Sequence, residues 1–335
     1  MEEISVKNYR SILESGKIEI RPLTVIVGRN SAGKSSFIRL FPLLKQTLER
    51  KISDTLLWYG DYVDFGDFQH TVSKQNPDAP IEISFSIMTY NRYYGRYLRR
   101  NEKSEYLAKI ELCIREKYIE RVSIDVFDQN ITFLTDNTGS TKVEINGDVR
   151  PYEKQEIIAF RETGNIIPTL YKKIKNNEQY MFRGLDVSDI VSYCKKYIYP
   201  DKEKKDIFLS SPFYYNDLDI SLGSKKEILT KLRKINPHKF NKMNIQHKRF
   251  QKINNFIVAA KLLEIIDRIN SSFLADMKQT SYLKPIRAMV NRYYRVQGIS
   301  IDELDADGSN LPMILKNMST IELSDFEKWS KEKFG

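Results

Sequence analysis

The chain has 335 residues and a net charge of +10, with 54 Lys and Arg against 44 Asp and Glu. Hydrophobic residues make up 41% and aromatic residues 12% of it, which excludes a disordered chain, and the length predicts two domains or one large domain with an insertion. No apolar run approaches the roughly 18 residues of a membrane span, and the acidic start Met1–Ser5 does not resemble a secretory leader. The two distant cysteines, Cys113 and Cys194, indicate neither a disulfide framework nor a zinc site, so we expect a reduced, cytoplasmic protein.

The first elements along the chain are three short predicted strands. Residues 3–7 and 17–20 alternate between apolar and polar side chains. Residues 23–27 are almost continuously apolar and predict a strand that is buried on both faces. An amphipathic helix is predicted over residues 37–48, with Pro42 placed to kink it by removing a backbone hydrogen bond.

Between the third strand and the helix lies a complete match to the pattern G-x-x-x-x-G-K-[ST], from Gly28 to Ser35. Glycines at both fixed positions let the loop wrap a phosphate with its backbone N–H groups. Lys34 is expected to reach the β- and γ-phosphates, and the Ser35 hydroxyl to coordinate Mg²⁺. The sequence therefore predicts a site for ATP with Mg²⁺, made of Gly28, Asn30, Ser31, Ala32, Gly33, Lys34, Ser35 and Ser36.

From Ile81 to about Val149 the hydrophobic period is two, which predicts an antiparallel β lobe. Asp136–Gly139 and Asn146–Asp148 are typical hairpin turns between its strands. The stretch Tyr90–Arg100 mixes arginines with tyrosines, a composition that suits nucleic acid and equally suits a solvated loop whose tyrosines pack on a neighbour.

Residues 151–280 are predicted to be mainly helical, and they hold nearly all of the net positive charge, with 24 Lys and Arg against 15 Asp and Glu. No acidic residue occurs from Leu229 to Leu263. This basic segment predicts contact with DNA, RNA or an acidic protein, against the alternative of a solvated face. The residues chosen as contacts are Lys239, Lys242, Lys248, Arg249 and Lys252.

The last part of the chain changes character again at Ser281. Tyr282–Arg287 predicts a strand that returns to the first domain, and Ser324 predicts the N-cap of a final helix. No clustered set of Asp, Glu and His indicates nuclease chemistry, and no catalytic residue is assigned.

Several stretches together resemble the cassette-type (SMC/Rad50-like) AAA-family ATPases of bacterial anti-phage defence, namely the overcoming-lysogenization-defect type and its Septu, PARIS and retron-associated relatives. The resemblance rests on Val25–Ser36, on Leu57–Gly60 with Tyr62–Gly66, and on Tyr282–Ala288 followed by Arg292–Tyr294. It implies an α/β fold, a P-loop cassette-type ATPase head with an antiparallel β lobe and a mainly helical insertion. Residues 1–150 would form the first part of the head, 151–280 the basic insertion, and 281–335 the return to the head.

The resemblance also implies a site completed by a second head. Two heads would sandwich ATP as a head-to-head dimer or higher oligomer, and a loop glutamine would meet Mg²⁺; Gln69 is the nearest candidate here, unless it is a surface glutamine in a turn. The apolar strand that ends in Asp-Glu and the Leu-Ser-x-Gly signature of such ATPases do not occur in these 335 residues. We therefore expect ATP hydrolysis only if residues beyond Gly335 or another chain supply that half of the site.

Two functions are consistent with this pattern. The first is an ATPase subunit of an anti-phage system, which acts as a nucleotide-dependent scaffold or sensor and controls a nuclease or toxin effector. The second is a DNA repair or recombination ATPase of the Rad50 type, whose insertion would be a long coiled coil. Prolines at positions 168, 200, 212 and 237 interrupt any such coiled coil and favour the first function. A transporter cassette or a small-molecule kinase fits badly, because no membrane segment is present and the insertion is too large.

Overall fold

The computed structural model describes residues 1–52, 54–90, 105–176, 179–185, 187–199, 220–284 and 304–334. It divides into two compact units, Met1–Met277 and Lys278–Gly335. The basic, aromatic stretch predicted at Tyr90–Arg100 lies outside the described residues except for Tyr90. Of the predicted returning strand, residues 282–284 are described and are not in a strand, while residues 285–287 lie outside the described ranges.

The first unit is built on one sheet, which has eleven strands among the described residues. The sheet order is β11-β10-β9-β8-β7-β6-β5-β4-β1-β2, with β3 also paired to β1, and every pairing given for these strands is antiparallel. The strands are β1 (Glu3–Tyr9), β2 (Ile12–Glu14), β3 (Ile18–Glu19), β4 (Ile81–Tyr90), β5 (Glu105–Ile114), β6 (Ile119–Val126), β7 (Gln129–Thr135), β8 (Ser140–Ile145), β9 (Ile157–Phe160), β10 (Thr169–Asn176) and β11 (Gln179–Gly184). The fold is therefore mixed α/β with a mostly antiparallel sheet.

The alternating sequence explains the central strands, and the prediction of an antiparallel lobe is confirmed. In β5 the side chains alternate between exposed and buried from Glu105 to Ile110, because successive side chains point to opposite faces of a sheet. The predicted turn after β8 forms with positive φ at both Asn146 and Gly147, which matches the twist of antiparallel strands.

The sheet extends further along the sequence than the predicted boundary at residue 150. Strands β9, β10 and β11 continue it to Gly184, and the helices of this segment begin only at Ser188. The segment predicted as a mainly helical insertion thus starts as part of the sheet. Apolar alternation is weak in these short strands: β9 is continuously apolar, and three lysines interrupt β10.

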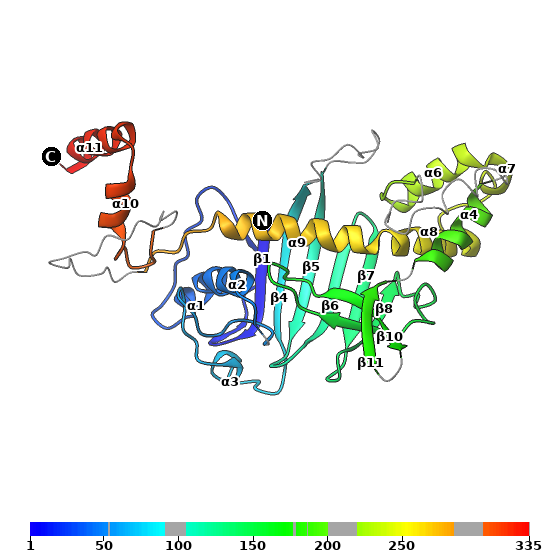
Figure 1. Cartoon of the computed structure of the whole chain (residues 1–335), viewed down its shortest axis with the longest axis horizontal. Helices are drawn as coiled ribbons and strands as arrows, with labels where there is room; N and C mark the ends of the chain where they lie inside the picture. The colour runs from blue at the N-terminus through cyan, green and yellow to red at the C-terminus, as the bar shows by residue number, and fades with distance from the viewer. Residues whose placement is uncertain are drawn as a thin grey trace. The chain divides into compact units, whose positions relative to one another are not determined.

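The helices of the first unit are α1 (Lys34–Ile38), α2 (Leu40–Glu49), α3 (Phe68–Thr71), α4 (Ser188–Ile198), α6 (Lys225–Ile235), α7 (Pro237–Phe240), α8 (Lys248–Ala260) and α9 (Leu262–Lys278). Helix α9 runs along one face of the sheet (Figure 1). Its buried Phe273 packs on Phe85 of β4, with ring centroids 4.6 Å apart. Its buried Asn270 accepts backbone hydrogen bonds from Ile166 and Ile167 and donates one to the Ile167 carbonyl. This face of the sheet forms the main core.

A buried amide network joins helix α8 to the sheet. Gln129 at the start of β7 donates to the Asn254 side chain at 3.1 Å and accepts from it at 2.8 Å. Next to them, the Asn146 amide donates to Asn255 at 2.8 Å. Because buried amides are costly unless paired, this network fixes how the helices α4, α6, α7 and α8 attach to the sheet.

The second unit contains helices α10 (Leu311–Asn317) and α11 (Thr320–Phe334). The predicted N-cap at Ser324 is wrong, because α11 begins four residues earlier in the sequence. Ser319 and Glu322 instead form reciprocal hydrogen bonds between side chain and backbone, the arrangement of a capping box.

Within the described residues, no helix combines the length and the apolar character that crossing a bilayer requires.

Candidate nucleotide-phosphate site

The predicted phosphate loop forms a turn that leads directly into α1. Ser31 and Gly33 both have left-handed backbone conformations, with φ of 62° and 91°. A non-glycine residue at positive φ is unusual, and strained backbone conformations of this kind are enriched at functional sites. Left-handed residues in a glycine-rich turn allow successive N–H groups to converge on an anion, which is the geometry that a phosphate requires.

Gly33 is held against the hairpin of β1 and β2. A Cβ atom at this position would lie 2.7 Å from Cγ1 of Ile12 and 3.1 Å from Oγ of Ser11, closer than packed atoms come. Positive φ and close packing therefore both require glycine here. The contact fixes the start of α1 beside the hairpin.

The helix after the loop is divided at Arg39, as the position of Pro42 predicts. Pro42 has no N–H to donate to the Ile38 carbonyl, and α1 ends at Ile38. Backbone hydrogen bonds from Arg39 to Ser35 and from Leu43 to Arg39 continue across the division. The loop thus leads into a nearly continuous helix whose second part is buried.

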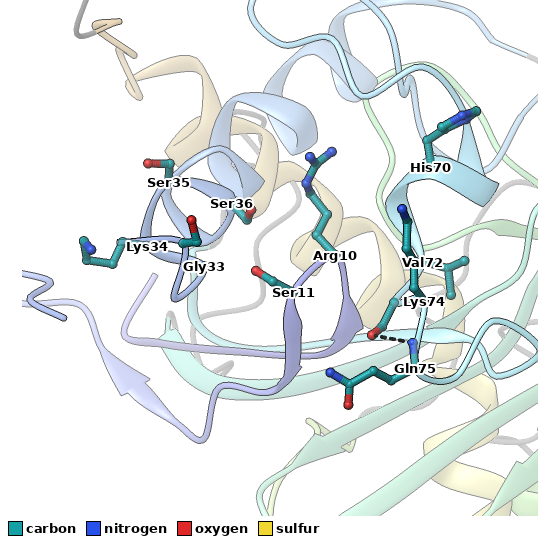
Figure 2. A pocket seen from close by; sticks show the side chains of 12 residues that line it. Arg10, Ser11, Gly33, Lys34, Ser35, Ser36, His70, Val72, Lys74 and Gln75 are labelled. Atoms are coloured by element: carbon teal, nitrogen blue, oxygen red, sulfur yellow. Dashed lines mark hydrogen bonds between the residues drawn. The ribbon is translucent and has the colours of Figure 1, made fainter. Parts of the chain in front are cut away.

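Lys34 folds back on its own loop. Its Nζ atom donates to the carbonyl oxygens of Gly28 at 2.7 Å and Arg29 at 2.6 Å. Figure 2 shows the side chain turned away from Arg10 and His70, on the other side of the pocket. These two hydrogen bonds tie the end of the loop to its beginning and hold the Lys34 ammonium group against the backbone of Gly28 and Arg29.

The segment before the loop corrects the sequence prediction. Residues 23–27 form no strand among the described residues, and the side chains of Leu23, Val25 and Val27 are 81%, 71% and 83% exposed. A strand that is buried on both faces needs a neighbouring strand at each edge and cover above and below. The described antiparallel sheet provides neither at this position, so the segment stays outside the sheet with these apolar side chains exposed.

A pocket of about 490 Å³ lies beside the loop, and Arg10, Ser11, Ser31, Gly33, Lys34, Ser35, Ser36, His70, Val72, Ser73, Lys74 and Gln75 line it. A volume of this size is typical of small-molecule sites. Gly28, Asn30 and Ala32 of the predicted site belong to the loop but do not line this pocket. The predicted residues Ser31, Gly33, Lys34, Ser35 and Ser36 are brought together in it (Figure 2).

Arg10 reaches the pocket from the turn between β1 and β2. Its φ is 53°, its backbone N–H donates to the Thr71 carbonyl at 2.7 Å, and its guanidinium lies 4.9 Å from the ring centre of Phe65. Asn8, also at positive φ, donates from its side chain to the carbonyls of Asn76 and Ala79 at 2.9 Å each. These contacts tie the hairpin to residues 71–79, and no sequence motif marked Arg10 as a site residue.

The opposite wall of the pocket follows α3. Gln69, the predicted glutamine, lies in α3 with an exposed side chain and is not among the lining residues, whereas His70, Lys74 and Gln75 are. Asp67 is the N-cap of α3: its Oδ1 accepts from the His70 N–H at 2.8 Å and lies 2.7 Å from His70 Nδ1. These hydrogen bonds, the backbone one foremost, lower the pKa of the Asp67 carboxyl.

The pocket fits a phosphate-bearing ligand. Arg10, Lys34, Lys74 and His70 line it, and neither Asp nor Glu is among its lining residues in the described part of the chain. An excess of cationic groups favours polyanions such as triphosphates. Ser35 lines the pocket, where its hydroxyl would be one ligand of a bound Mg²⁺, with phosphate oxygens and water as the others.

The basic residues predicted to contact a partner lie away from this pocket, on the helices beyond β8. Lys239 is in α7, Lys242 follows α7, and Lys248, Arg249 and Lys252 are in the first turns of α8. All are exposed except Lys252, which is half-buried. The residues form two groups along the sequence, one at α7 and one at the start of α8. None of them lines the pocket beside the phosphate loop.

A phosphate loop on a mixed α/β unit defines a nucleotide-binding protein of the ATPase class. The family model of the AAA ATPase domain matches residues 1–327, and the chain belongs to that family. No curated protein and no solved structure matches the chain. The family supports a general ATPase function, with ATP as the nucleotide and Mg²⁺ as the usual ion.

Proposed function

We propose that the chain is the ATP-binding subunit of a bacterial anti-phage defence system, acting as a nucleotide-dependent scaffold or sensor that controls a nuclease or toxin effector. The family supports the ATPase class, and the resemblance of Val25–Ser36 and Tyr62–Gly66 to defence ATPases supports the biological role. The observation that carries the proposal is the phosphate loop, with Gly33 packed on Ile12 and Lys34 closing the loop beside a cationic pocket.

Within this proposal the phosphate loop is half of a composite site in a cassette-type head. The exposed side chains of Leu23, Val25 and Val27 beside the loop are an apolar surface of the kind that assembly covers. Head-to-head pairing or a higher oligomer would cover it and supply the groups that the pocket lacks. The oligomer would hold ATP between heads and report nucleotide state to the effector.

Slow turnover follows from the same pocket. Hydrolysis of ATP needs a group that positions the attacking water and charges that stabilise the transition state, beyond the contacts that bind phosphate. No carboxylate lines the pocket in the described residues. We expect the isolated chain to bind ATP and hydrolyse it slowly, and brisk turnover by the isolated chain would contradict this.

The insertion favours a defence ATPase over the Rad50-type alternative. A repair ATPase of that type would carry a long coiled coil there. The described residues of the segment contain three strands and helices of at most 17 residues, and the longest, α9, has its apolar face buried on the sheet.

We further propose that the basic helices bind DNA, RNA or an acidic protein. We also propose that the protein works in the cytoplasm, where its buried free cysteines Cys113 and Cys194 would stay reduced.

The test is Lys34→Ala, with ATP affinity, oligomer size and protection from phage measured together. Loss of a charged hydrogen-bond partner of phosphate weakens binding about 10- to 100-fold. The matched control is Lys17→Ala, since Lys17 is exposed, pairs with Glu3 at 3.6 Å and does not line the pocket. If Lys34→Ala leaves all three properties intact, the proposal fails; if only phage protection survives, the defence role does not depend on nucleotide.

A further inference from the structure

A row of three aromatic rings crosses helices α4 and α8 on the helical side of the first unit. Tyr193 of α4 lies between Tyr197, one turn further along the same helix, and Phe256 of α8. Both neighbouring ring pairs have centroids 4.6 Å apart, with planes tilted by 39° and 42°. Tyr197 is 39% exposed, and the other two rings are half-buried. We call this row of three rings the aromatic ladder; Tyr197 is its exposed end.

Cations border the ladder at both ends. The Lys252 ammonium lies 4.7 Å from the ring centre of Tyr193 and 5.7 Å from that of Phe256. The Lys239 ammonium lies 5.7 Å from the ring centre of Tyr197 and donates to the Tyr197 carbonyl at 3.3 Å. Lysine ammonium groups are usually directed into water. Here two of them lie over the rings of the ladder, so the surface presents positive charge and aromatic rings side by side.

Arginines add to the positive field around the central ring. Burial raises the pKa of the Tyr193 hydroxyl, and the nearby Arg150 and Arg249 act against that rise. The acidic groups in this region include Asp148, Glu153 and, on α4 itself, Asp189. The Asp148 carboxylate is occupied by two side-chain hydrogen bonds from Arg150, at 2.7 and 2.6 Å, and by one from Asn255 at 3.3 Å. Asp148 therefore neutralises one arginine and leaves Arg249 and the two lysines to face a ligand.

We propose that the aromatic ladder binds single-stranded nucleic acid, with a base stacked on the exposed outer ring, Tyr197, and phosphates held by Lys239, Arg249 and Lys252. The inference deepens the proposed role of the basic helices and rests on it. Unpaired bases stack on aromatic side chains whatever their sequence, while cations follow the backbone. A duplex keeps its bases stacked inside and cannot use the ladder, and an acidic protein would need the charges alone.

The experiment measures binding of labelled dT15, rU15 and a 15-base-pair DNA duplex to the full chain by fluorescence anisotropy. Tyr197→Ala removes the most exposed ring and should weaken binding of both single strands about fivefold or more. Tyr197→Phe keeps the ring and should leave affinity within about twofold of wild type. Circular dichroism and the thermal midpoint establish that both variants are folded; Tyr193→Phe serves as a second ring-preserving control.

A second variant, the double substitution Lys248→Glu with Arg249→Glu, distinguishes the contribution of positive charge to binding from the contribution of the aromatic ladder. It should weaken all three probes in a salt-dependent way, because phosphate contacts release counterions. The ladder proposal is overturned if Tyr197→Ala weakens binding of the duplex as much as binding of the single strands. It is also overturned if Tyr197→Ala leaves binding of all three probes unchanged while the charge-reversed variant weakens it. In both cases the basic helices remain a general polyanion surface. If neither variant changes binding, the proposed nucleic-acid role of these helices also fails. Unequal affinities for dT15 and rU15 would identify which strand chemistry is preferred.

Discussion

The face of the sheet under α9 and the segment that leads into the phosphate loop are built from similar residues but end in opposite environments. Phe273 and Phe85 are almost fully buried against each other, whereas Leu23, Val25 and Val27 are mostly exposed. The first surface is closed by a helix of the same chain, and the second has no partner among the described residues. Stability and nucleotide binding should therefore depend on different regions, which single substitutions can separate.

The largest expected effect is in the core. Phe273→Ala removes a ring that is 0% exposed and should lower the free energy of unfolding by about 3–5 kcal/mol. Val25→Ala removes apolar atoms that are already in water and should change it by less than about 0.5 kcal/mol. Urea unfolding followed by circular dichroism measures both. Equal losses would mean that residues 23–27 are packed in solution and that the contrast between the two regions is false.

The next effect is at the loop. Gly33→Ala places a methyl group 2.7 Å from Ile12 in a left-handed conformation and should cost about 1–3 kcal/mol of stability together with a marked loss of ATP affinity. The matched control is Gly139→Ala in the turn between β7 and β8, which has φ of 83° and no atom within 4 Å of the added carbon. The control shares the backbone strain without the contact and should leave ATP affinity unchanged. Similar ATP affinities for the two variants would refute the role of Gly33 in the site.

The smallest effect is a dependence on pH at the junction between sheet and helices. Hydrogen bonds from Arg150, and a weaker one from Asn255, hold the pKa of Asp148 below its unfolded value of about 3.9. This contribution to stability is therefore complete above that unfolded value and is lost as pH falls through the lower folded value. Because Asp148 is partly solvated, Asp148→Asn should cost less than about 1 kcal/mol at pH 6. The difference from wild type should shrink in acid, and the exposed Asp54→Asn serves as the control; a difference that grows in acid would contradict the assignment.

Local patterns in the sequence predict the elements that local physics decides. Alternation identified the strands from β4 to β8, and the spacing of Gly28, Gly33 and Lys34 identified the loop. The capping box at Ser319 also follows a local pattern, since Ser-x-x-Glu occurs there, five residues before the predicted cap at Ser324.

The rest of the pocket could not be read from local sequence. Arg10 and Gln75 meet the loop only because Asn8 and Arg10 take left-handed conformations and bond to residues far along the chain. The exposure of residues 23–27 could not be read either, because an apolar run reveals that a strand could be buried and not whether a neighbour is there to bury it.

The central claim is that ATP binds the phosphate loop and the adjoining cationic pocket. Hydrogen–deuterium exchange of the full chain, with and without Mg·ATP, tests it directly because it reports protection segment by segment. The account predicts slower exchange in residues 28–38 and 70–75 with ATP, little change in α8, and loss of the protection in Lys34→Ala. Protection confined to other segments, or no protection at saturating ATP, would contradict it.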